Sequence, residues 1–302
     1  MRYGALKIGL NTQNQIKFKK ILVHSPVLLQ NVIKSLDVNK KGLYIDATVG
    51  EGGHLREILV RGGKTLALDI DSEQIAKVKN LFNSYIKKGQ LVLSRNNFAD
   101  LEKAARQYNF FPVDGILIDL GLSYRQIVES GRGFSYEKPN EILDMRLDKS
   151  IKVKARDIVK SYTEDELYEL FAGNSEDINS RSIAENIVRS RSIRAINTVR
   201  DLLNVINKTL NKKDMGTYAR IFQALRMGVN NEIENLKSGI IAGSKILRKG
   251  GKLLIITFHS IEDRIVKNFV NNTKLFAQME LIKGNREFRY ERSAKLRVLI
   301  KK

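Results

Sequence analysis

Short apolar stretches alternate with helical patterns through the first 120 residues and resume near residue 251. Each stretch is almost continuously apolar and is bounded by glycine or polar residues, which is typical of strands covered on both faces. The stretches are "GLYIDAT" (42–48), "KTLALDI" (64–70), "QLVLSR" (90–95), "DGILIDL" (114–120) and "GKLLIITF" (251–258). Because strands that alternate with helices pair in parallel, the pattern predicts an α/β fold with a doubly wound, mostly parallel sheet.

The intervening segments carry helix signals. "SEQIAKVKNLFNSYIKK" has apolar residues at helical spacing and follows Asp71, which together with Ser72 is a candidate N-cap. "TEDELYELF" begins with a capping-box pair, Thr163 and Glu166, and "TVRDLLNVINKTL" begins with another, Thr198 and Asp201. Residues 217–251 predict one long helix that ends at a glycine pair and returns the chain to the sheet.

The alternation is interrupted between the fourth and fifth strands, where about a hundred residues contain helical patterns and no clear strand. We therefore expect a helical insertion in a single sheet domain. The expected boundaries are a basic N-terminal extension over 1–20, a sheet domain over 21–122 and 216–302, and a helical substrate-recognition insertion over 123–215.

The glycine loop in "LYIDATVGEGGH" (43–54) has a carboxylate on each side, Asp46 and Glu51. Glycine loops after a strand usually bind phosphate, but these carboxylates would repel a diphosphate and attract a cationic ligand such as S-adenosylmethionine. Asp69 lies at the end of the second strand, where an acidic residue receives the ribose hydroxyls of an adenosine cofactor; Asp71 is better placed as a helix cap. Taken alone, "GEGG" is equally consistent with a tight turn between strand and helix.

The net charge indicates a nucleic-acid partner. The chain has 53 Lys+Arg against 33 Asp+Glu, a formal charge of +20, although a lysine-rich composition alone would give the same excess. The absence of cysteine excludes disulfides, thiolate nucleophiles and cysteine zinc sites, and three histidines far apart in the sequence argue against a metal. No apolar run has the length of a membrane span, and we expect a cytoplasmic protein.

Several longer strings resemble the ribosomal RNA small-subunit methyltransferase H (MraW) family, in the family's order. They are "HSPVLL" (24–29), "IDATVGEGGHLREIL" (45–59), "DGILIDLGLSYRQI" (114–127), "RGFSYEKPNEILDMRLD" (132–148), "RIFQALRMGVNNEIENL" (220–236), "GGKLLIITFHSIEDRIVKNF" (250–269) and "RSAKLRV" (292–298). Two places depart from the family pattern: Tyr124 replaces the usual second serine, and "FRYE" precedes "RSAKLR".

The resemblance implies a class I methyltransferase with a Rossmann-like sheet and a helical insertion. It implies transfer of a methyl group from S-adenosylmethionine to the exocyclic N4 of a cytidine in the decoding centre of small-subunit (16S) rRNA. By family motif, the cofactor contacts fall on Gly52, Gly53, His54, Asp69, Phe98, Asp119 and Gln126. Phe98 is equally consistent with ordinary core, Gln126 with a solvated helix position, and His54 with a structural hydrogen bond.

The lone pair of the cytosine N4 is delocalised into the ring, so the enzyme must hold the amine in line with the methyl group and accept a proton. Asp119 ranks first for this role, with Ser123 beside it and His259 second, although His259 is equally consistent with a hydrogen-bonded loop residue. Asp144 and Arg146 are further candidates to face the acceptor base. The candidate RNA contacts are Arg181, Arg189, Arg191, Arg194 and Arg200, with seven basic residues between 286 and 302.

Three other functions stay open at this point. One is methylation of a protein or small molecule, another is RNA binding without catalysis, and the third, a nicotinamide oxidoreductase, is disfavoured by Asp46 and Glu51. The expected partners are small-subunit rRNA or the assembled 30S subunit, with a homodimer as an open alternative and neither a membrane nor a metal.

Overall fold

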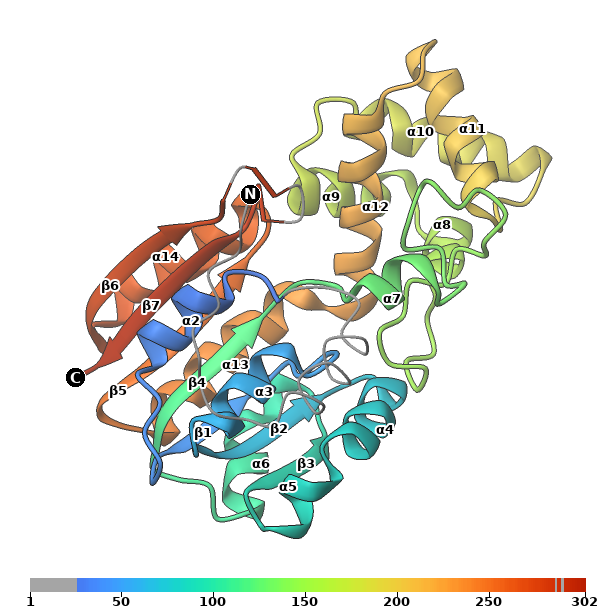
Figure 1. Ribbon diagram of the computed structural model, residues 1–302. Coiled ribbons are helices and arrows are strands. Elements are labelled where there is room, and N and C mark those ends of the chain that lie inside the picture. Colours follow the sequence, from blue (N-terminus) through green and yellow to red (C-terminus); the bar gives the residue numbers. More distant parts are fainter. Residues whose placement is uncertain (1–25, 286, 289–290) are drawn as a thin grey trace.

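A seven-stranded sheet forms the centre of the molecule (Figure 1). The computed structural model describes residues 26–285, 287–288 and 291–302. The strand order is β3-β2-β1-β4-β5-β7-β6, with β1 to β5 parallel and β7 antiparallel to both neighbours. The strands are β1 Leu43–Asp46, β2 Lys64–Asp69, β3 Leu91–Arg95, β4 Val113–Asp119, β5 Leu247–Thr257, β6 Phe276–Lys283 and β7 Lys295–Lys301. The predicted doubly wound, mostly parallel sheet is confirmed, and all five expected strands are present.

The last two strands, β6 and β7, were not predicted. Positive charges interrupt the apolar pattern of β7 and led us to interpret this region as basic surface. Two of those charges are neutralised within the fold, because Lys295 Nζ and Arg297 Nε lie 2.7 and 2.6 Å from the carboxylate of Asp263. The antiparallel strand therefore fits between β5 and β6 with the Arg297 side chain buried.

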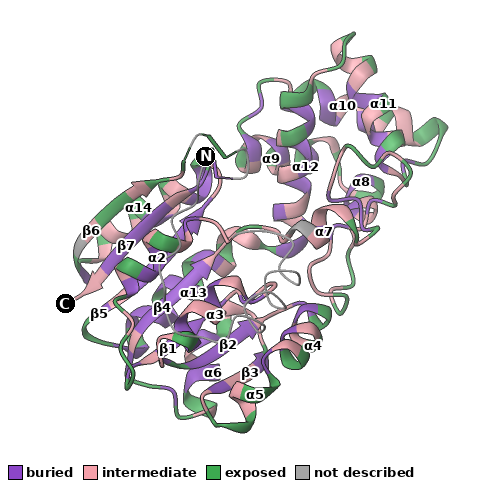
Figure 2. Ribbon diagram, in the orientation of Figure 1, coloured by how far each residue is buried: buried purple, intermediate pink, exposed green. Residues whose placement is uncertain are grey.

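Helices cover both faces of the sheet (Figures 1 and 2). One face packs against α2, α3 and α4, and the other against α6, α13 and α14, so that the strands between them are buried. The expected single helix after β2 is two helices, α4 and α5, which meet at Phe82. The bounds are α2 Leu29–Leu36, α3 Gly53–Val60, α4 Ser72–Leu81, α5 Asn83–Lys87, η1 Phe98–Asp100, α6 Leu101–Gln107, α13 Glu232–Ile246 and α14 Ser260–Thr273.

The other helices form a separate body beside the carboxyl edge of the sheet (Figure 1). They are α7 Tyr124–Val128, α8 Ala155–Ser161, α9 Glu164–Ser175, α10 Ser180–Ile193, α11 Val199–Leu210 and α12 Met215–Asn230. Both predicted capping boxes are present, at Thr163 with Glu166 and at Thr198 with Asp201. The body has its own apolar core. The residues that α12 contributes to this core are Tyr218, Ile221, Phe222, Ala224, Leu225 and Val229. The C-terminal boundary expected at residue 215 therefore excludes a helix that packs with the insertion.

The predicted long helix over 217–251 is wrong in two respects. It breaks at Asn231, whose φ of 50° separates α12 from α13, and asparagine tolerates this left-handed conformation better than most residues. It also ends at Ile246, because residues 247–250 already belong to β5. The break redirects the chain from the insertion onto the face of the sheet.

The basic extension predicted over 1–20, and His24, lie outside the described residues. Within the described residues, no helix is both long and apolar enough to cross a membrane. In the same part of the chain, no group of three or more histidine or acidic side chains is arranged to hold a metal ion.

Candidate active site

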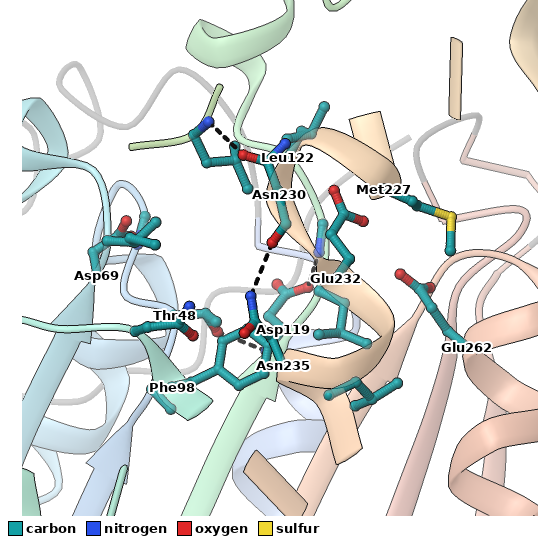
Figure 3. Close-up of a pocket in the computed structure, with 18 of the residues that line it drawn as sticks. Thr48, Asp69, Phe98, Asp119, Leu122, Met227, Asn230, Glu232, Asn235 and Glu262 are labelled. Carbon is teal, nitrogen blue, oxygen red and sulfur yellow. Dashed lines mark hydrogen bonds between the residues drawn. The ribbon is translucent and has the colours of Figure 1, made fainter. Parts of the chain in front are cut away.

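Two connected pockets lie at the carboxyl ends of the parallel strands. The inner pocket, about 110 Å³, is drawn in Figure 3, where Thr48, Asp69 and Asp119 follow β1, β2 and β4. Helical residues close it from the other side: Phe98, Met227, Asn230, Glu232, Asn235 and Glu262. The outer cleft, about 640 Å³, lies between the sheet and the insertion. Both are lined by the segment from Asp119 to Ser123, so the two spaces meet there.

Three carboxylates, Asp46 buried and Asp69 and Asp119 partly buried, end neighbouring strands of this edge. Burial raises the pKa of Asp46 to about 7 and that of Asp69 to about 6, and it also raises the pKa of Asp119. Asp46 Oδ2 is buried without a hydrogen-bond partner among the described residues. Ionised carboxylates are costly in such a place unless a positive charge approaches them.

Asp69 is held by the backbone around it. Its Oδ2 accepts a hydrogen bond from Gly50 N at 2.8 Å and its Oδ1 accepts one from Asp71 N at 2.9 Å. The remaining lone pairs of the carboxylate are available to the hydroxyl groups of a ligand. Asp71 caps α4, as predicted, by accepting from Glu73 N at 2.9 Å.

The two predicted loop glycines make close approaches instead of lining the inner pocket. Gly52 has φ 83° at the start of α3, and a Cβ there would lie 2.6 Å from the ring of Phe82. Gly53 lines the outer cleft, where a Cβ would lie 2.2 Å from Pro26. Neither position therefore accepts a side chain without rearrangement, and Gly50 is the loop glycine that reaches the inner pocket.

Phe98, Gln126 and Ser123 all line the inner pocket. Phe98 also packs against α13, since a Cβ at Gly239 would lie 2.6 Å from its ring. Ser123 and Gln126 form the capping box of α7, and Gln126 Nε2 donates to Asp71 Oδ2 at 3.3 Å. This network orients both polar side chains at the junction of the two pockets.

His54 is buried beside Asp119 in the wall of the outer cleft. Its Nε2 donates to Val27 O at 3.0 Å, and its Nδ1 lies 3.9 Å from Asp119 Oδ2. Burial lowers the pKa of His54, so the imidazole is neutral and its Nδ1 presents a lone pair to the carboxyl group.

His259 lines the outer cleft, but both its ring nitrogens face Glu262. Nε2 lies 3.0 Å from Glu262 Oε1, and Nδ1 accepts from Glu262 N at 3.5 Å as the N-cap of α14. Nε2 is buried and makes no hydrogen bond among the described residues, so His259 would have to turn before this nitrogen could reach a proton of the substrate. Asp119, which lines both pockets, is better placed for this role.

A buried charged cluster between the two pockets was not found from the sequence. It consists of Arg226, Glu232, Glu262 and His259, with Arg226 Nε 2.9 Å from Glu232 Oε1. Its two glutamates line the inner pocket, while Arg226 lines the outer cleft. The available signal was the set of polar residues in "RMGVNNEIENL" that interrupts an otherwise apolar helix pattern.

The structure does not bring the other predicted substrate residues to either pocket. Arg146 pairs with Asp144 at 2.7 Å and also donates to the carbonyl oxygens of Lys149 and Ile151, so this pair organises its own loop. Arg181 pairs with Asp165 at 2.6 Å, Arg189 pairs with Glu185 at 2.7 Å, and Arg194 follows α10. Contact of these five residues with RNA stays a prediction.

The donor set of the inner pocket fits a cationic ligand. Asp69, Asp119, Glu232 and Glu262 line it, and no lysine, arginine or histidine of residues 26–285 or of the described C-terminal residues does. Glu232 is paired with Arg226, but a diphosphate would still face Asp69 and Asp119 without a lysine or arginine beside them, whereas a sulfonium and an ammonium would be attracted. S-adenosylmethionine, when bound, supplies an electrophilic methyl group. When it is bound, Asp69 would receive its ribose hydroxyls and Phe98 would cover its adenine, and both roles stay predictions.

Comparison with known proteins agrees with this chemistry. The family model described as the MraW methylase family matches residues 21–302. The chain belongs to the MraW methylase family. The protein is thus an S-adenosylmethionine-dependent methyltransferase.

Relatives with curated names span most of the chain. It is 38% identical over 264 residues to the ribosomal RNA small subunit methyltransferase H of Cytophaga hutchinsonii, covering 86% of each chain. It is 37% identical to the protein of that name from Dictyoglomus thermophilum, covering 91% of this chain and 96% of the relative. Among solved structures, an rRNA methylase from Streptococcus thermophilus gives a TM-score of 0.45 at 11% identity, covering 93% of this chain and 98% of that one.

Proposed function

We propose that this member of the MraW methylase family transfers a methyl group to the exocyclic N4 of a cytidine in the decoding centre of small-subunit rRNA. The observation that carries the proposal is the meeting of an acidic inner pocket and a wider cleft at Asp119–Ser123. A donor held in the first and a base held in the second would face each other at that segment. The names of the curated relatives support rRNA as the acceptor class.

The residues at the junction suit attack by a weakly nucleophilic amine. Asp119 lines both spaces, and its raised pKa makes it a stronger base than an exposed aspartate. The hydroxyl of Ser123 is held by Gln74 Nε2 at 2.9 Å, and it can orient the amine as an acceptor or donor of a hydrogen bond. We assign Asp119 as the proton acceptor and Ser123 as the orienting group.

The charge of the molecule favours RNA over a peptide or a small-molecule substrate. A formal charge of +20 provides phosphate contacts that neither alternative would need. We also infer a cytoplasmic protein, in the compartment of the ribosomal subunits, whose substrate is either free rRNA or the assembled small subunit.

Nucleoside mass spectrometry tests the proposal. Small-subunit rRNA from cells with and without this gene is digested, and 4-methylcytidine is quantified. We expect the modified nucleoside to be lost without the gene and restored by the wild-type gene but not by Asp119→Asn. Unchanged 4-methylcytidine in the deletion strain would contradict the assignment of the acceptor.

A further inference from the structure

The outer cleft has an aromatic wall. Four aromatic side chains line it: Phe134, Tyr136, Phe222 and Phe258. Phenylalanine, tyrosine and tryptophan make up only 7% of the chain, so aromatic residues are more frequent around this cleft than in the chain as a whole. Aromatic faces are the surfaces on which proteins stack bases that have left a helix.

Tyr136 differs from the other aromatic residues of this wall. Its ring is held by Tyr218 at 5.8 Å and by Phe222 at 6.1 Å, the latter edge to face. Phe134 and Phe222 are buried, whereas Tyr136 and Phe258 are partly exposed, and Phe258 follows β5 on the sheet side of the cleft. Tyr218 uses its hydroxyl to contact Asn207, but the hydroxyl of Tyr136 has no hydrogen-bond partner among the described residues. Tyr136 therefore offers the cleft a supported ring and a free hydroxyl.

The charges that line the two spaces differ. The outer cleft is lined by Arg226 together with the carboxylates of Glu51, Asp119 and Glu137, whereas the inner pocket has only acidic charges among its described lining residues. The cationic methyl donor thus suits the inner pocket, and the outer cleft, with charges of both signs and an aromatic wall, suits the base of a nucleotide more than its phosphate.

We propose that Tyr136 is the platform on which the acceptor pyrimidine base stacks in the outer cleft. The inference rests on the proposed function and adds the residue of the insertion that holds the base. Tyr136 stands on the insertion side of the cleft and Asp119 on the sheet side, so a base stacked on the ring can turn its exocyclic amine towards the junction. The insertion therefore contributes directly to the geometry of the acceptor.

Steady-state kinetics with isolated small subunits and labelled S-adenosylmethionine tests the proposal. Tyr136→Leu keeps an apolar side chain of moderate size but removes the aromatic face, and Tyr136→Phe keeps that face. Tyr168→Leu is the matched control, because Tyr168 packs on the same helical core, against Arg181, and lines neither pocket. Calorimetric titration with S-adenosylmethionine alone and thermal unfolding accompany each variant.

We expect Tyr136→Leu to lower kcat/KM for the subunit by about 5- to 150-fold, the range for stacking of one base, mainly through KM. Its affinity for S-adenosylmethionine stays within about twofold of wild type, and Tyr136→Phe stays within about threefold in kcat/KM, because the aromatic face and the inner pocket are retained. Equal kinetics of Tyr136→Leu and Tyr168→Leu would overturn the inference alone. Absence of transfer by the wild-type protein would overturn the proposed function, and the inference with it.

Discussion

Asp119 is the residue on which both pockets converge, and its carboxylate is the group most directly open to test. Asp119→Asn keeps the shape of the side chain but removes the base. We expect kcat to fall about 100-fold or more, the usual contribution of a positioned proton acceptor. Asp114→Asn is the matched control, because Asp114 lies on the same strand and instead pairs with Arg248 at 2.6 Å. Turnover of Asp119→Asn within about threefold of the control would exclude a proton-transfer role.

The raised pKa values of Asp46 and Asp69 give the affinity for S-adenosylmethionine a pH dependence. In the free protein these carboxyl groups titrate at about 7 and about 6, and a cationic ligand favours their ionised forms. We expect the dissociation constant measured by calorimetry to increase as the pH falls from 8 to 5, by up to about tenfold per pH unit for each group. Asp46→Asn should flatten this profile, and an affinity independent of pH in the wild-type protein would contradict the electrostatic account.

The same two groups make the ligand-free protein more stable in mild acid. Their pKa values in the unfolded chain lie near the model value of 3.8, so between that value and about 7 the folded chain holds more protons than the unfolded chain. The stability contributed by these groups is therefore fully present below about pH 4, decreases as the pH rises above that value, and is fully lost once the pH has passed the folded pKa values of about 6 and about 7. Thermal unfolding of wild type and Asp46→Asn at pH 6 and 8 measures this, and the variant should lose less stability over that interval.

At the scale of elements, the break between α12 and α13 connects the insertion to the inner pocket. Asn230 Oδ1 accepts from Leu147 N at 2.7 Å, and its Nδ2 donates to Met145 O at 2.8 Å. Asn230→Ala leaves these backbone groups unsatisfied, and we expect a loss of about 2–4 kcal/mol of unfolding free energy in urea denaturation. Asn186→Ala, which removes an exposed hydrogen bond within one helix, should change the same quantity by less than about 0.5 kcal/mol. A similar loss of unfolding free energy in both variants would show that the hydrogen bonds of Asn230 stabilise the fold no more than an exposed hydrogen bond within a helix.

Strands and helices with a regular local pattern could be predicted from the sequence. Features that depend on contacts between distant segments could not. The five buried strands, the caps at Asp71, Thr163 and Thr198, and the acidic strand ends all carry local signals. The break at Asn231 carries no such signal, and the residue beside it, Asn230, bonds to a loop that lies about 85 residues earlier. The cluster of Arg226 with Glu232 and the platform at Tyr136 likewise depend on packing between distant segments.

For the whole molecule, the net charge of +20 predicts that binding of rRNA depends on salt concentration much more than binding of S-adenosylmethionine does. RNA binding releases counterions from phosphates, so we expect affinity for small-subunit rRNA to fall about fifty-fold or more between 50 and 200 mM salt, the value for about four contacted phosphates. Affinity for S-adenosylmethionine should change much less, because its partners are buried side chains. Filter binding and calorimetry over the same salt series check this, and equal salt dependence of both ligands would contradict the separation of the two sites.

The parallel pairing of β4 with β5 has a consequence for biosynthesis. The two neighbours are separated by the entire insertion, and Asn230, Glu232 and Glu262 complete the inner pocket only after that insertion has been translated. During synthesis the inner pocket can therefore be completed only after the insertion and the start of α14 have emerged from the ribosome, so a shorter nascent chain should not bind the methyl donor.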